Sequence, residues 1–526
     1  MVCDTVYNNI MEGLVFCCAC LSLIPCLIPL LVPHLFCGTS RLSSLYTSFN
    51  SLLCDNYIKS TYLSYLSGHP NHVFSTYTSL IPEYQASIMG SIALEEDQPS
   101  FKTPWVQTPL VESASLSRAA GCRVFLKLEN VQPSGSFKSR AMGNQILSHL
   151  IKPENANRPV HFYASSGGNA GLAAVCAARS LGYPCTVVVP LSTKPLMVQK
   201  LRMAGAADVI QHGDTFLAAG EYMREVIMKN KDDNESEDVA KIALHPFDNE
   251  PIWEGNSTLI DELAAQLPPP AGEEEEATHR GRPLPVDAII CSVGGGGLLN
   301  GLVMGIERHR QLQKMSISYA SNPISHSQPN PINLLAIETL GTDSLAAAVA
   351  KKSLVSLPKI TSQATSLGAI RVSERTFQYA ISPPPGIAVH SAVLSDADAA
   401  RGVLRLADDH RTLVELACGV CVEAAVGDAA RARSSTSSDA LTSGTKKRKR
   451  EDADYPSHRD EGYGDDGSSA TETESEAGSE IQSKLKQLVP DLNSDSRVVI
   501  IVCGGSNITI DMAAEYKKLL NEGWGN

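Results

Sequence analysis

The chain has 526 residues, of which 43% are hydrophobic and 19% are charged, and its formal net charge is −13. That length is sufficient for more than one hydrophobic core. With 44 basic against 57 acidic residues, the chain offers no broad basic surface for a phosphate backbone, so nucleic acid is not expected as a main partner. A mean hydropathy of −0.07 excludes a polytopic membrane protein. The composition therefore predicts a soluble enzyme or binding protein.

Residues 1–97 differ from the rest and are predicted to form a weakly structured N-terminal extension. Residues 14–37 contain no Lys, Arg, Asp or Glu and are long enough to cross a bilayer. Asp4 and Glu12 stand where a signal peptide has positive charges, and three prolines within the segment remove helical hydrogen bonds. A membrane anchor is therefore one interpretation. The favoured one is an appended stretch with no part in the chemistry.

From about Phe101, short apolar runs alternate with amphipathic helical patterns, and this alternation predicts an α/β fold. Three segments have the composition of solvated loops and are predicted to be disordered insertions, at about residues 267–285, 316–331 and 427–480. Within the last, Lys446 to Arg450 (KKRKR) resembles a nuclear-import signal, although such a charge run is more often simply solvated. The predicted strands are residues 124–129, 160–164, 185–189, 208–211, 288–292, 333–338 and 497–503.

Residues 133–138 (PSGSFK) form a Gly/Ser turn that places Lys138 at a junction between a strand and a helix. Burial there would disfavour the charged ammonium and lower the pKa of the lysine, and only a neutral amine attacks an aldehyde. Lys138 is therefore a candidate for forming a Schiff base. A surface lysine in a loop is the alternative, and the surrounding pattern argues against it.

Two further turns open helices and expose backbone N–H groups. Residues 165–171 (SSGGNAG) follow a strand and begin an Ala-rich helix, which is a geometry that binds a carboxylate or a phosphate. Residues 292–298 (SVGGGGL) contain four consecutive glycines, whose entropy cost indicates a close approach to the main chain. The sequence has neither GxxxxGK[ST] nor a GxGxxG with an acidic ribose-binding residue, which favours a small phosphorylated cofactor over a nucleotide. Ordinary glycine-rich turns are the alternative.

Cysteines contribute two further candidates. Residues 503–507 (CGGSN) end an apolar strand and place Cys503 on the rim where α/β folds bind ligands, although such a cysteine is often small core filling. Cys418 and Cys421 have redox spacing but lie in a helical pattern and lack a second pair for zinc, so core packing is favoured. The 13 histidines form no HExxH set, and a transition-metal site is not supported.

Together these four turns resemble those of the fold-type II pyridoxal-phosphate enzymes, and most closely those of the catabolic L-serine/L-threonine dehydratases. The resemblance extends from about Thr103 to the C-terminus and includes HPFD at 245–248, IWEG at 252–255, IET at 337–339 and LPKITS at 357–362. It implies a fold similar to the tryptophan synthase β-subunit, with two open twisted α/β domains and the cofactor in the cleft between them. Residues 98–131 and 236–526 would form the large cofactor-binding domain, and residues 132–235 the small domain that binds the substrate carboxylate.

The resemblance also implies roles for single residues. Lys138 would hold pyridoxal 5′-phosphate covalently, with Phe137 beside the ring and Cys503 facing the pyridine nitrogen. Asn169 would bind the 3′ oxygen of the ring, and with Ser166 and Gly167 it would hold the substrate carboxylate. The implied residues of the glycine turn around the cofactor are Gly294, Gly295, Gly296, Gly297 and Leu298. The implied ligands of a monovalent cation such as K⁺ are Gly294, Glu338, Thr342, Ser344, Leu367 and Ala369.

The reaction implied by the resemblance is β-elimination from L-serine, which gives pyruvate and ammonia, and from L-threonine, which gives 2-oxobutyrate. This is an activity of amino-acid catabolism, expected of a cytoplasmic homodimer. β-Replacement, as in cysteine or cystathionine synthases, and serine racemisation are alternatives, but Cys503 and the HPFD stretch favour the dehydratase. An inactive regulatory descendant is the alternative that is not an enzyme. Because a thiol supplies less charge than an aspartate, we expect the pyridine nitrogen to stay unprotonated.

Overall fold

The computed structural model describes residues 101–229, 238–270, 272, 279, 281–318, 330–427 and 483–525. The chain divides into two units, residues 1–98 and 99–526, and all of the described residues belong to the second. The predicted extension of residues 1–97, its apolar segment 14–37 and the run Lys446 to Arg450 lie outside the described residues, as does most of the insertions predicted at 316–331 and 427–480. No described helix combines the length and apolar character needed to cross a membrane.

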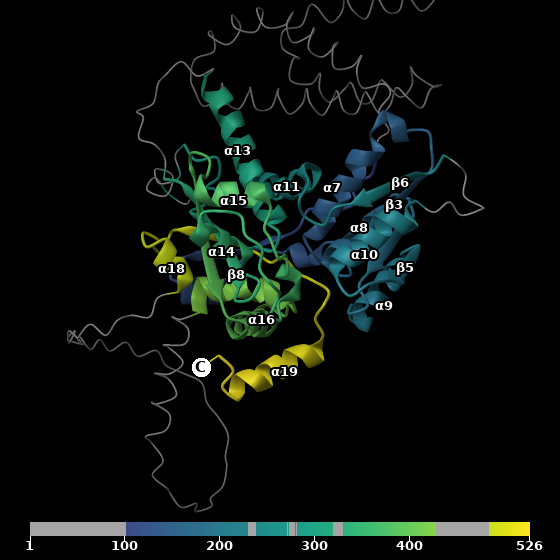
Figure 1. Ribbon diagram of the computed structural model, residues 1–526. Helices are drawn as coiled ribbons and strands as arrows, with labels where there is room; N and C mark the ends of the chain where they lie inside the picture. The colour runs from purple at the N-terminus through teal and green to yellow at the C-terminus, as the bar shows by residue number, and fades with distance from the viewer. Residues whose placement is uncertain are drawn as a thin grey trace, which may run out of the picture. The chain divides into compact units, whose positions relative to one another are not determined.

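Two β-sheets organise the described residues, which confirms the predicted α/β fold (Figure 1). The larger has the order β1-β2-β10-β7-β8-β9, in which only the β1 and β2 pair is antiparallel. The smaller sheet has the order β5-β4-β3-β6, and all of its strands are parallel. The larger sheet comprises β1 (Leu110–Glu112), β2 (Arg123–Lys127), β7 (Ala288–Ser292), β8 (Ile332–Thr339), β9 (Ile387–Leu394) and β10 (Arg497–Ile501). The smaller comprises β3 (Val160–Ala164), β4 (Cys185–Val189), β5 (Asp208–Gln211) and β6 (Ala240–Leu244).

Helices cover these sheets, and Figure 1 shows α8 to α10 beside the smaller sheet and α14 to α16 beside β8 of the larger one. The helices from the N-terminal half are α6 (Ala114–Ala120), α7 (Lys138–Leu150), α8 (Asn169–Ser180), α9 (Pro195–Ala204), α10 (Phe216–Tyr222) and α11 (Glu250–Gln266). The others are α13 (Gly297–Ser318), α14 (Ser344–Lys351), α15 (Glu374–Ile381), α16 (Asp396–His410), a helix at residues 416–427, α18 (Lys484–Leu488) and α19 (Ile510–Asn521).

Three of the inner strands are buried along their whole length. All residues of β4, β7 and β10 are buried, as expected for parallel strands with neighbours on both sides and helices on the faces. β3, β4, β5 and β7 have the predicted bounds, whereas β1, β6 and β9 were not predicted. Because β6 pairs with β3, the smaller sheet continues to Leu244, beyond the predicted domain boundary at residue 235.

The prediction of a solvated loop at about residues 267–285 is wrong for its described part. Leu267 and Leu284 belong to the core of the larger sheet, and the Arg497 guanidinium donates to the backbone carbonyls of Pro268 and Pro269. Burial alone would raise the pKa of Asp287, but hydrogen bonds from His279, Arg282 and a backbone N–H lower it to about 2. These buried contacts hold both ends of the segment, which composition alone did not reveal.

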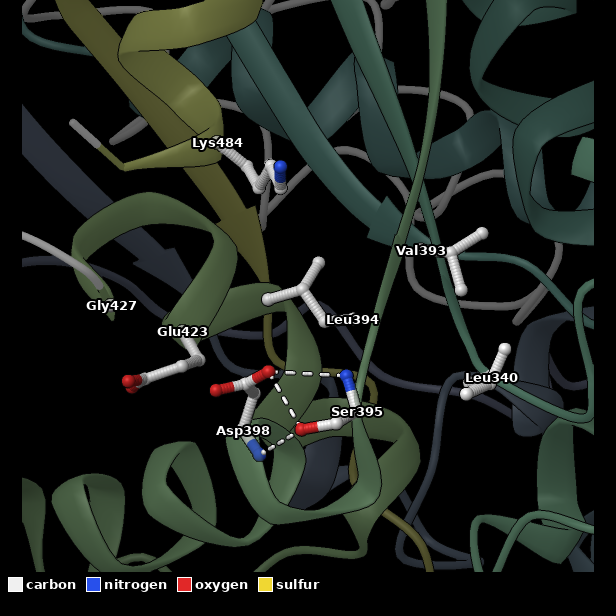
Figure 2. Close-up of a pocket in the computed structure, with 8 residues that line it drawn as sticks. All are labelled: Leu340, Val393, Leu394, Ser395, Asp398, Glu423, Gly427 and Lys484. Carbon is white, nitrogen blue, oxygen red and sulfur yellow. Dashed lines mark hydrogen bonds between the residues drawn. The ribbon is translucent and has the colours of Figure 1, made fainter. Parts of the chain in front are cut away.

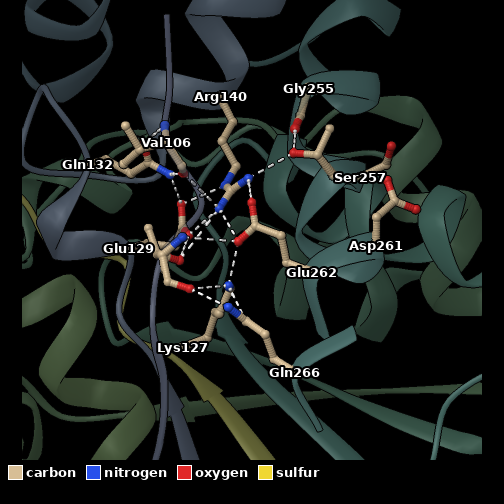
Figure 3. A network of polar contacts seen from close by, with 12 residues as sticks. Val106, Lys127, Glu129, Gln132, Arg140, Gly255, Ser257, Asp261, Glu262 and Gln266 are labelled. Carbon is tan, nitrogen blue, oxygen red and sulfur yellow. Dashed lines mark hydrogen bonds and ion pairs between the residues drawn. The ribbon is translucent and has the colours of Figure 1, made fainter. Parts of the chain in front are cut away.

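A buried polar network, shown in Figure 3, joins β2, α7 and α11. The Arg140 guanidinium donates to both carboxylate oxygens of Glu129, each at 2.8 Å, and to those of Glu262 at 2.6 and 2.9 Å. Lys127 Nζ donates to Glu262 at 2.5 Å and to Gln266 Oε1 at 2.8 Å. Two cations thus balance two carboxylates, and the geometry around Arg140 is bidentate. Since Arg140 lies two residues after Lys138, the network fixes the first turn of α7.

We expect Arg140→Met to lower the free energy of unfolding by about 3–5 kcal/mol, because it leaves buried carboxylates without their cation. Urea denaturation followed by circular dichroism measures the change. Lys229→Gln is the control, since it removes an ion pair with Glu225 in which both side chains are exposed, and it should leave the unfolding midpoint unchanged. Equal stability of the Met variant and the parent would contradict the proposed role of Arg140.

Candidate active site

The turn that carries Lys138 contacts the turn that follows β10. Ser136 and Gly504 form an isolated antiparallel β-bridge, and Phe137 N donates to Cys503 O at 3.1 Å. Gly504 has a φ of +82°, and a Cβ atom there would lie 2.3 Å from Gly135 O. Glycine is therefore required at 504 for the two turns to approach, which brings Lys138 and Cys503 to one place.

Lys138 is the first residue of α7, and its side chain is partly buried. Its Nζ donates to Pro246 O at 2.8 Å and lies 5.1 Å from the centroid of the Phe137 ring. Burial lowers the pKa of Lys138 to about 8, and the charge of Cys503 opposes this shift. The direction agrees with the expectation from the sequence, and the lysine has an amine that is partly neutral near physiological pH.

The glycine turn lies between β7 and α13, which begins at Gly297. The first N–H groups of this helix have no acceptor within the helix and face the turn, so they can bind an anion. Protein groups also pack on the turn: a Cβ atom at Gly295 would lie 2.2 Å from the Phe247 ring, and one at Gly296 1.9 Å from Thr376 Oγ1. The four glycines predicted a close approach of some group to the main chain, and protein side chains account for part of that approach.

The turn before α8 also forms by close backbone packing. A Cβ atom at Gly171 would lie 1.8 Å from Ser166 O, and one at Gly167 2.7 Å from Thr193 Cγ2. The helix begins at Asn169, and Gly168 N donates to Ser166 Oγ at 3.4 Å. Ser166, Gly167 and Asn169, predicted together as carboxylate ligands, thus lie around one helix N-terminus.

Glu415 is a residue of this region that sequence reasoning missed. It precedes the helix at residues 416–427, is 4% exposed, and accepts from Asn169 Nδ2 at 3.0 Å and from Asn507 N at 2.7 Å. Ser366 Oγ also donates to it, and Ser506 N donates to Asn169 Oδ1 at 2.9 Å. The carboxylate therefore ties the turn of the smaller sheet to two turns of the larger one. A single acidic residue in the apolar run LVELACGVC was the only signal in the sequence.

The HPFD stretch lies over the glycine turn. His245 Nδ1 accepts from Asp248 N at 2.8 Å, and Trp253 Nε1 donates to Phe247 O at 3.0 Å, which fixes the loop. Burial lowers the pKa of His245, and the positive charge of Lys138 acts in the same direction although Asp248 opposes it. His245 is therefore a neutral neighbour of the lysine rather than a second cation.

The residues predicted to bind a monovalent cation lie in the glycine turn, at the end of β8, at the start of α14 and around residues 367–369. Glu338, the second-last residue of β8, is fully buried and accepts from Leu345 N and Ala346 N, each at 2.8 Å, while burial raises its pKa to about 8. A Cβ atom at Gly294 would lie 3.1 Å from Leu367 Cα. Ser344 Oγ is buried and has no hydrogen-bond partner among the described residues. Ala369 N donates to Leu367 O at 2.7 Å, and Thr342 Oγ1 lies 2.7 Å from Thr339 Oγ1.

The described residues contain no cluster of three or more His, Cys, Asp or Glu side chains suited to a metal ion. Any cation bound here would therefore be held mainly by carbonyl and hydroxyl oxygens, with Glu338 as the carboxylate. That ligand chemistry fits a large, weakly hydrated monovalent ion better than a transition metal.

A separate pocket of about 380 Å³ lies beside the start of α16 and contains none of the predicted site residues (Figure 2). Ser395 and Asp398 in its lining form a capping box, with Asp398 N donating to Ser395 Oγ at 3.1 Å and Ser395 Oγ to Asp398 at 2.7 Å. These polar groups are used to begin α16. The lining residues are Leu340, Val393, Leu394, Ser395, Asp398, Glu423, Gly427 and Lys484.

The sequence and the fold of this chain are similar to those of known proteins. The profile of the family described as "Pyridoxal-phosphate dependent enzyme" matches residues 102–442. A Saccharomyces cerevisiae protein named L-serine dehydratase is 39% identical over 323 residues, which are 60% of this chain and 84% of the relative. A mouse protein named L-serine dehydratase/L-threonine deaminase is 37% identical, over 61% of this chain and 82% of its own length. The solved structure of a fungal L-serine ammonia-lyase from Rhizomucor miehei matches with a TM-score of 0.55 and 26% identity, over 79% of this chain and 99% of that one.

We expect competitive acetylation to show an unusually acidic Lys138. Because burial lowers its pKa to about 8, its labelling rate should rise through pH 8 in the folded protein freed of any bound aldehyde cofactor. In urea the same peptide should label with a midpoint near the ordinary lysine value of about 10.4. Mass spectrometry of the Lys138 peptide across a pH series measures both midpoints. The same midpoint in the folded and the unfolded protein would contradict the burial argument.

Proposed function

Because this chain belongs to the family of pyridoxal-phosphate-dependent enzymes, we propose that it is an L-serine/L-threonine ammonia-lyase. L-Serine would lose its Cα proton and Cβ hydroxyl as water, and a second water would replace the nitrogen, so that the net products are pyruvate and ammonia. L-Threonine would give 2-oxobutyrate in the same way. The observation that carries the proposal is the partly buried Lys138, whose pKa is lowered to about 8 at the meeting point of four turns. The names of the yeast and mouse relatives support the choice of substrate.

The residues present fit pyridoxal 5′-phosphate. Lys138 offers a partly neutral amine for its aldehyde, and the N-terminus of α13 at Gly294 to Gly297 offers N–H groups for its phosphate. Ser136 Oγ, two residues before the lysine, is buried without a hydrogen-bond partner among the described residues. When bound, the cofactor supplies a ring that withdraws electrons from the substrate Cα. Phe137 would lie beside that ring and Cys503 near its nitrogen.

Lys138 would act as the base that removes the Cα proton. At pH 7, a pKa of about 8 leaves about one amine in ten neutral, against about one in 2,500 at the ordinary value of about 10.4. Pro246 O accepts a hydrogen bond from Nζ and orients it. Since Lys138 opens α7 and Arg140 fixes that turn, the amine is held in place before the substrate arrives.

The substrate carboxylate would bind at the N-terminus of α8. Ser166, Gly167 and Asn169 lie around that end of the helix, where the backbone dipole favours an anion. One N–H of the Asn169 amide is donated to Glu415, which leaves the second for the substrate or for the 3′ oxygen of the cofactor. Glu415 would thus set the orientation of the amide. A homodimer in the cytoplasm stays a prediction of the resemblance.

The assignment is tested by incubating the purified chain with L-serine and L-threonine and measuring 2-oxoacid and ammonia in equal amounts. Borohydride reduction followed by peptide mapping should place a pyridoxyl group on Lys138. Lys138→Ala should remove that adduct and lower kcat by at least about 10³-fold, because both the anchor and the base are lost. Lys517→Ala, at an exposed position of α19, should behave as the parent.

Other outcomes would identify the rival functions. D-Serine without 2-oxoacid would indicate a racemase, and product formation only in the presence of a thiol would indicate β-replacement. A folded chain that carries no pyridoxyl group after reduction would support the inactive regulatory descendant and overturn the enzyme proposal.

We also propose that potassium binds beside the glycine turn, on the grounds of the buried Glu338 and of the Ser344 hydroxyl, which has no hydrogen-bond partner in the described part of the chain. Replacing tetramethylammonium with potassium at constant ionic strength should stabilise the folded protein by about 1.4 kcal/mol at ten times the dissociation constant. Ser344→Ala should weaken this response. Ser391→Ala should keep it, although it also removes a buried hydroxyl, on β9, that has no partner among the residues the structure describes. Equal unfolding midpoints of the parent in the two salts would contradict the site.

A further inference from the structure

The backbone of Ser506 is bound by side chains from the helices that follow β3 and β4. Ser506 lies in the turn after β10, and its N–H donates to Asn169 Oδ1 at 2.9 Å. Its carbonyl oxygen accepts from Lys200 Nζ. Asn169 is the first residue of α8 and Lys200 lies in α9, so two helices of the smaller sheet hold one residue of this turn. Lys200 therefore links α9 to the turn after β10.

Neighbouring turns hold the residues on either side of Ser506. Gly505 N donates to Gly135 O at 2.9 Å, and Asn507 N donates to Glu415 Oε1 at 2.7 Å. Gly505 has a φ of +121°, and a Cβ atom there would lie 2.3 Å from the same Glu415 oxygen, so glycine is required for this approach. Each of these three residues therefore has an acceptor for its backbone N–H.

The carbonyl of Ser506 and the N–H of Asn507 belong to one peptide unit, and its two ends have partners of opposite charge. Lys200 donates to the oxygen, and Glu415 accepts from the N–H. Because a peptide unit is planar, bonds at both ends fix its rotation about the chain direction. Hydrogen bonds in such a chain also polarise one another, so the ammonium strengthens the bond between the N–H and the carboxylate. Lys200 therefore acts on Glu415 through a single peptide unit.

Glu415 is also the residue that orients the amide of Asn169. Its Oε1 accepts from Asn169 Nδ2 at 3.0 Å as well as from Asn507 N. Since Ser506 N donates to Asn169 Oδ1, these four residues form a closed ring of hydrogen bonds. Both polar atoms of the amide are used, and the amide cannot rotate without breaking two bonds. The peptide unit that Lys200 holds is part of this ring.

The alternative is that Lys200 is an ordinary surface cation. Lys194, which precedes α9, and Arg202, within it, have exposed side chains, whereas Lys200 is partly buried and its ammonium is bound to a backbone oxygen. Exposed cations of this kind contribute little to the energetics of a fold. Lys200 is therefore the cation of α9 that can influence the site, and Arg202 offers a matched control.

We propose that Lys200 is a positioning residue, which holds the 506–507 peptide unit against Glu415 and thereby fixes the Asn169 amide for the substrate carboxylate. The inference rests on the proposed function, because the resemblance is what assigns Asn169 to the substrate. Lys200 acts only through the ring of hydrogen bonds and takes no part in removing the Cα proton, which is the role of Lys138. Its loss should therefore weaken substrate binding more than it slows the reaction.

Steady-state kinetics with L-serine measures this difference. Lys200→Met keeps the apolar stem and removes the donor, so it should raise KM about five- to tenfold while kcat changes by less than about twofold. Lys200→Arg keeps a cationic donor and should have a KM within about twofold of the parent value. Arg202→Met removes an exposed cation of the same helix and should leave both constants unchanged. A Lys200→Met variant with the parent KM, or with a loss in kcat alone, would overturn the inference.

A double-mutant cycle tests whether Lys200 acts through Glu415. Glu415→Gln keeps the shape of the side chain and removes its charge. Because Lys200 and Glu415 hold the same peptide unit, the effect of Lys200→Met on KM should be smaller in the Glu415→Gln background than in the parent. The effects of Lys200→Met and Arg202→Met should simply add. Additive effects of Lys200→Met and Glu415→Gln would contradict the link through the peptide unit.

Hydrogen exchange followed by mass spectrometry reads the peptide unit itself in the full chain without substrate. Lys200→Met should speed exchange about fivefold or more in the proteolytic fragment that contains Ser506 and Asn507, because the N–H groups of both belong to the ring. Arg202→Met should leave the exchange of this fragment unchanged. Parent-like protection of the fragment in Lys200→Met would count against the proposed contact.

These two measurements separate the inference from the proposed function. Hydrogen exchange requires no turnover, so faster exchange of the fragment in a chain that makes no 2-oxoacid would reject the ammonia-lyase and keep the hold of Lys200 on the peptide unit. An active chain in which Lys200→Met changes neither KM nor exchange would reject the role of Lys200 alone.

Discussion

The position of Lys138 depends on the bidentate ion pairs of Arg140. Lys138 and Arg140 share the first turn of α7, and the guanidinium of Arg140 joins Glu129, which follows β2, to Glu262 on α11. A buried arginine with two carboxylates and a second cation, Lys127, contributes less to net stability than an apolar core would, but its directional bonds allow only one register of α7. We therefore interpret the main role of the network as fixing the position of Lys138.

The chemistry of the site then follows from burial and from helix ends. Burial makes the Lys138 amine less basic, and the opposing effect of Cys503 is too small to restore the ordinary pKa. In the proposed site, backbone N–H groups at the N-termini of α8 and α13 would bind the anions of substrate and cofactor. Neighbouring side chains fix the position of these two helix N-termini. Phe247 and Thr376 lie against the glycine turn, and Glu415 holds the turn of Asn169 against residues 506–507.

The strands that the sequence predicted with correct bounds are those marked by one clear pattern of residues. β3, β4 and β7 are short apolar runs between turns, and such runs mark buried parallel strands. β6 and β9 were not predicted because Lys241 and His390 interrupt their apolar character, and their pairing is set by distant strands. The segment at about 267–285 was misjudged because Pro and Glu dominate its composition, whereas its burial depends on Arg497, more than 200 residues away. The role of Glu415 likewise depends on tertiary contacts, with Asn169 and Asn507.

Anion binding by helix ends, as proposed here, would have a consequence for the pKa of Lys138. A guanidinium placed near Lys138 to bind phosphate would repel the ammonium and lower its pKa further, and the pKa would then change as the anion came and went. Partial charges of backbone N–H groups exert a weaker and fixed influence. Burial lowers the pKa of Lys138 and the charge of Cys503 raises it. Both influences belong to the protein, so the basicity of the amine does not change when the product leaves.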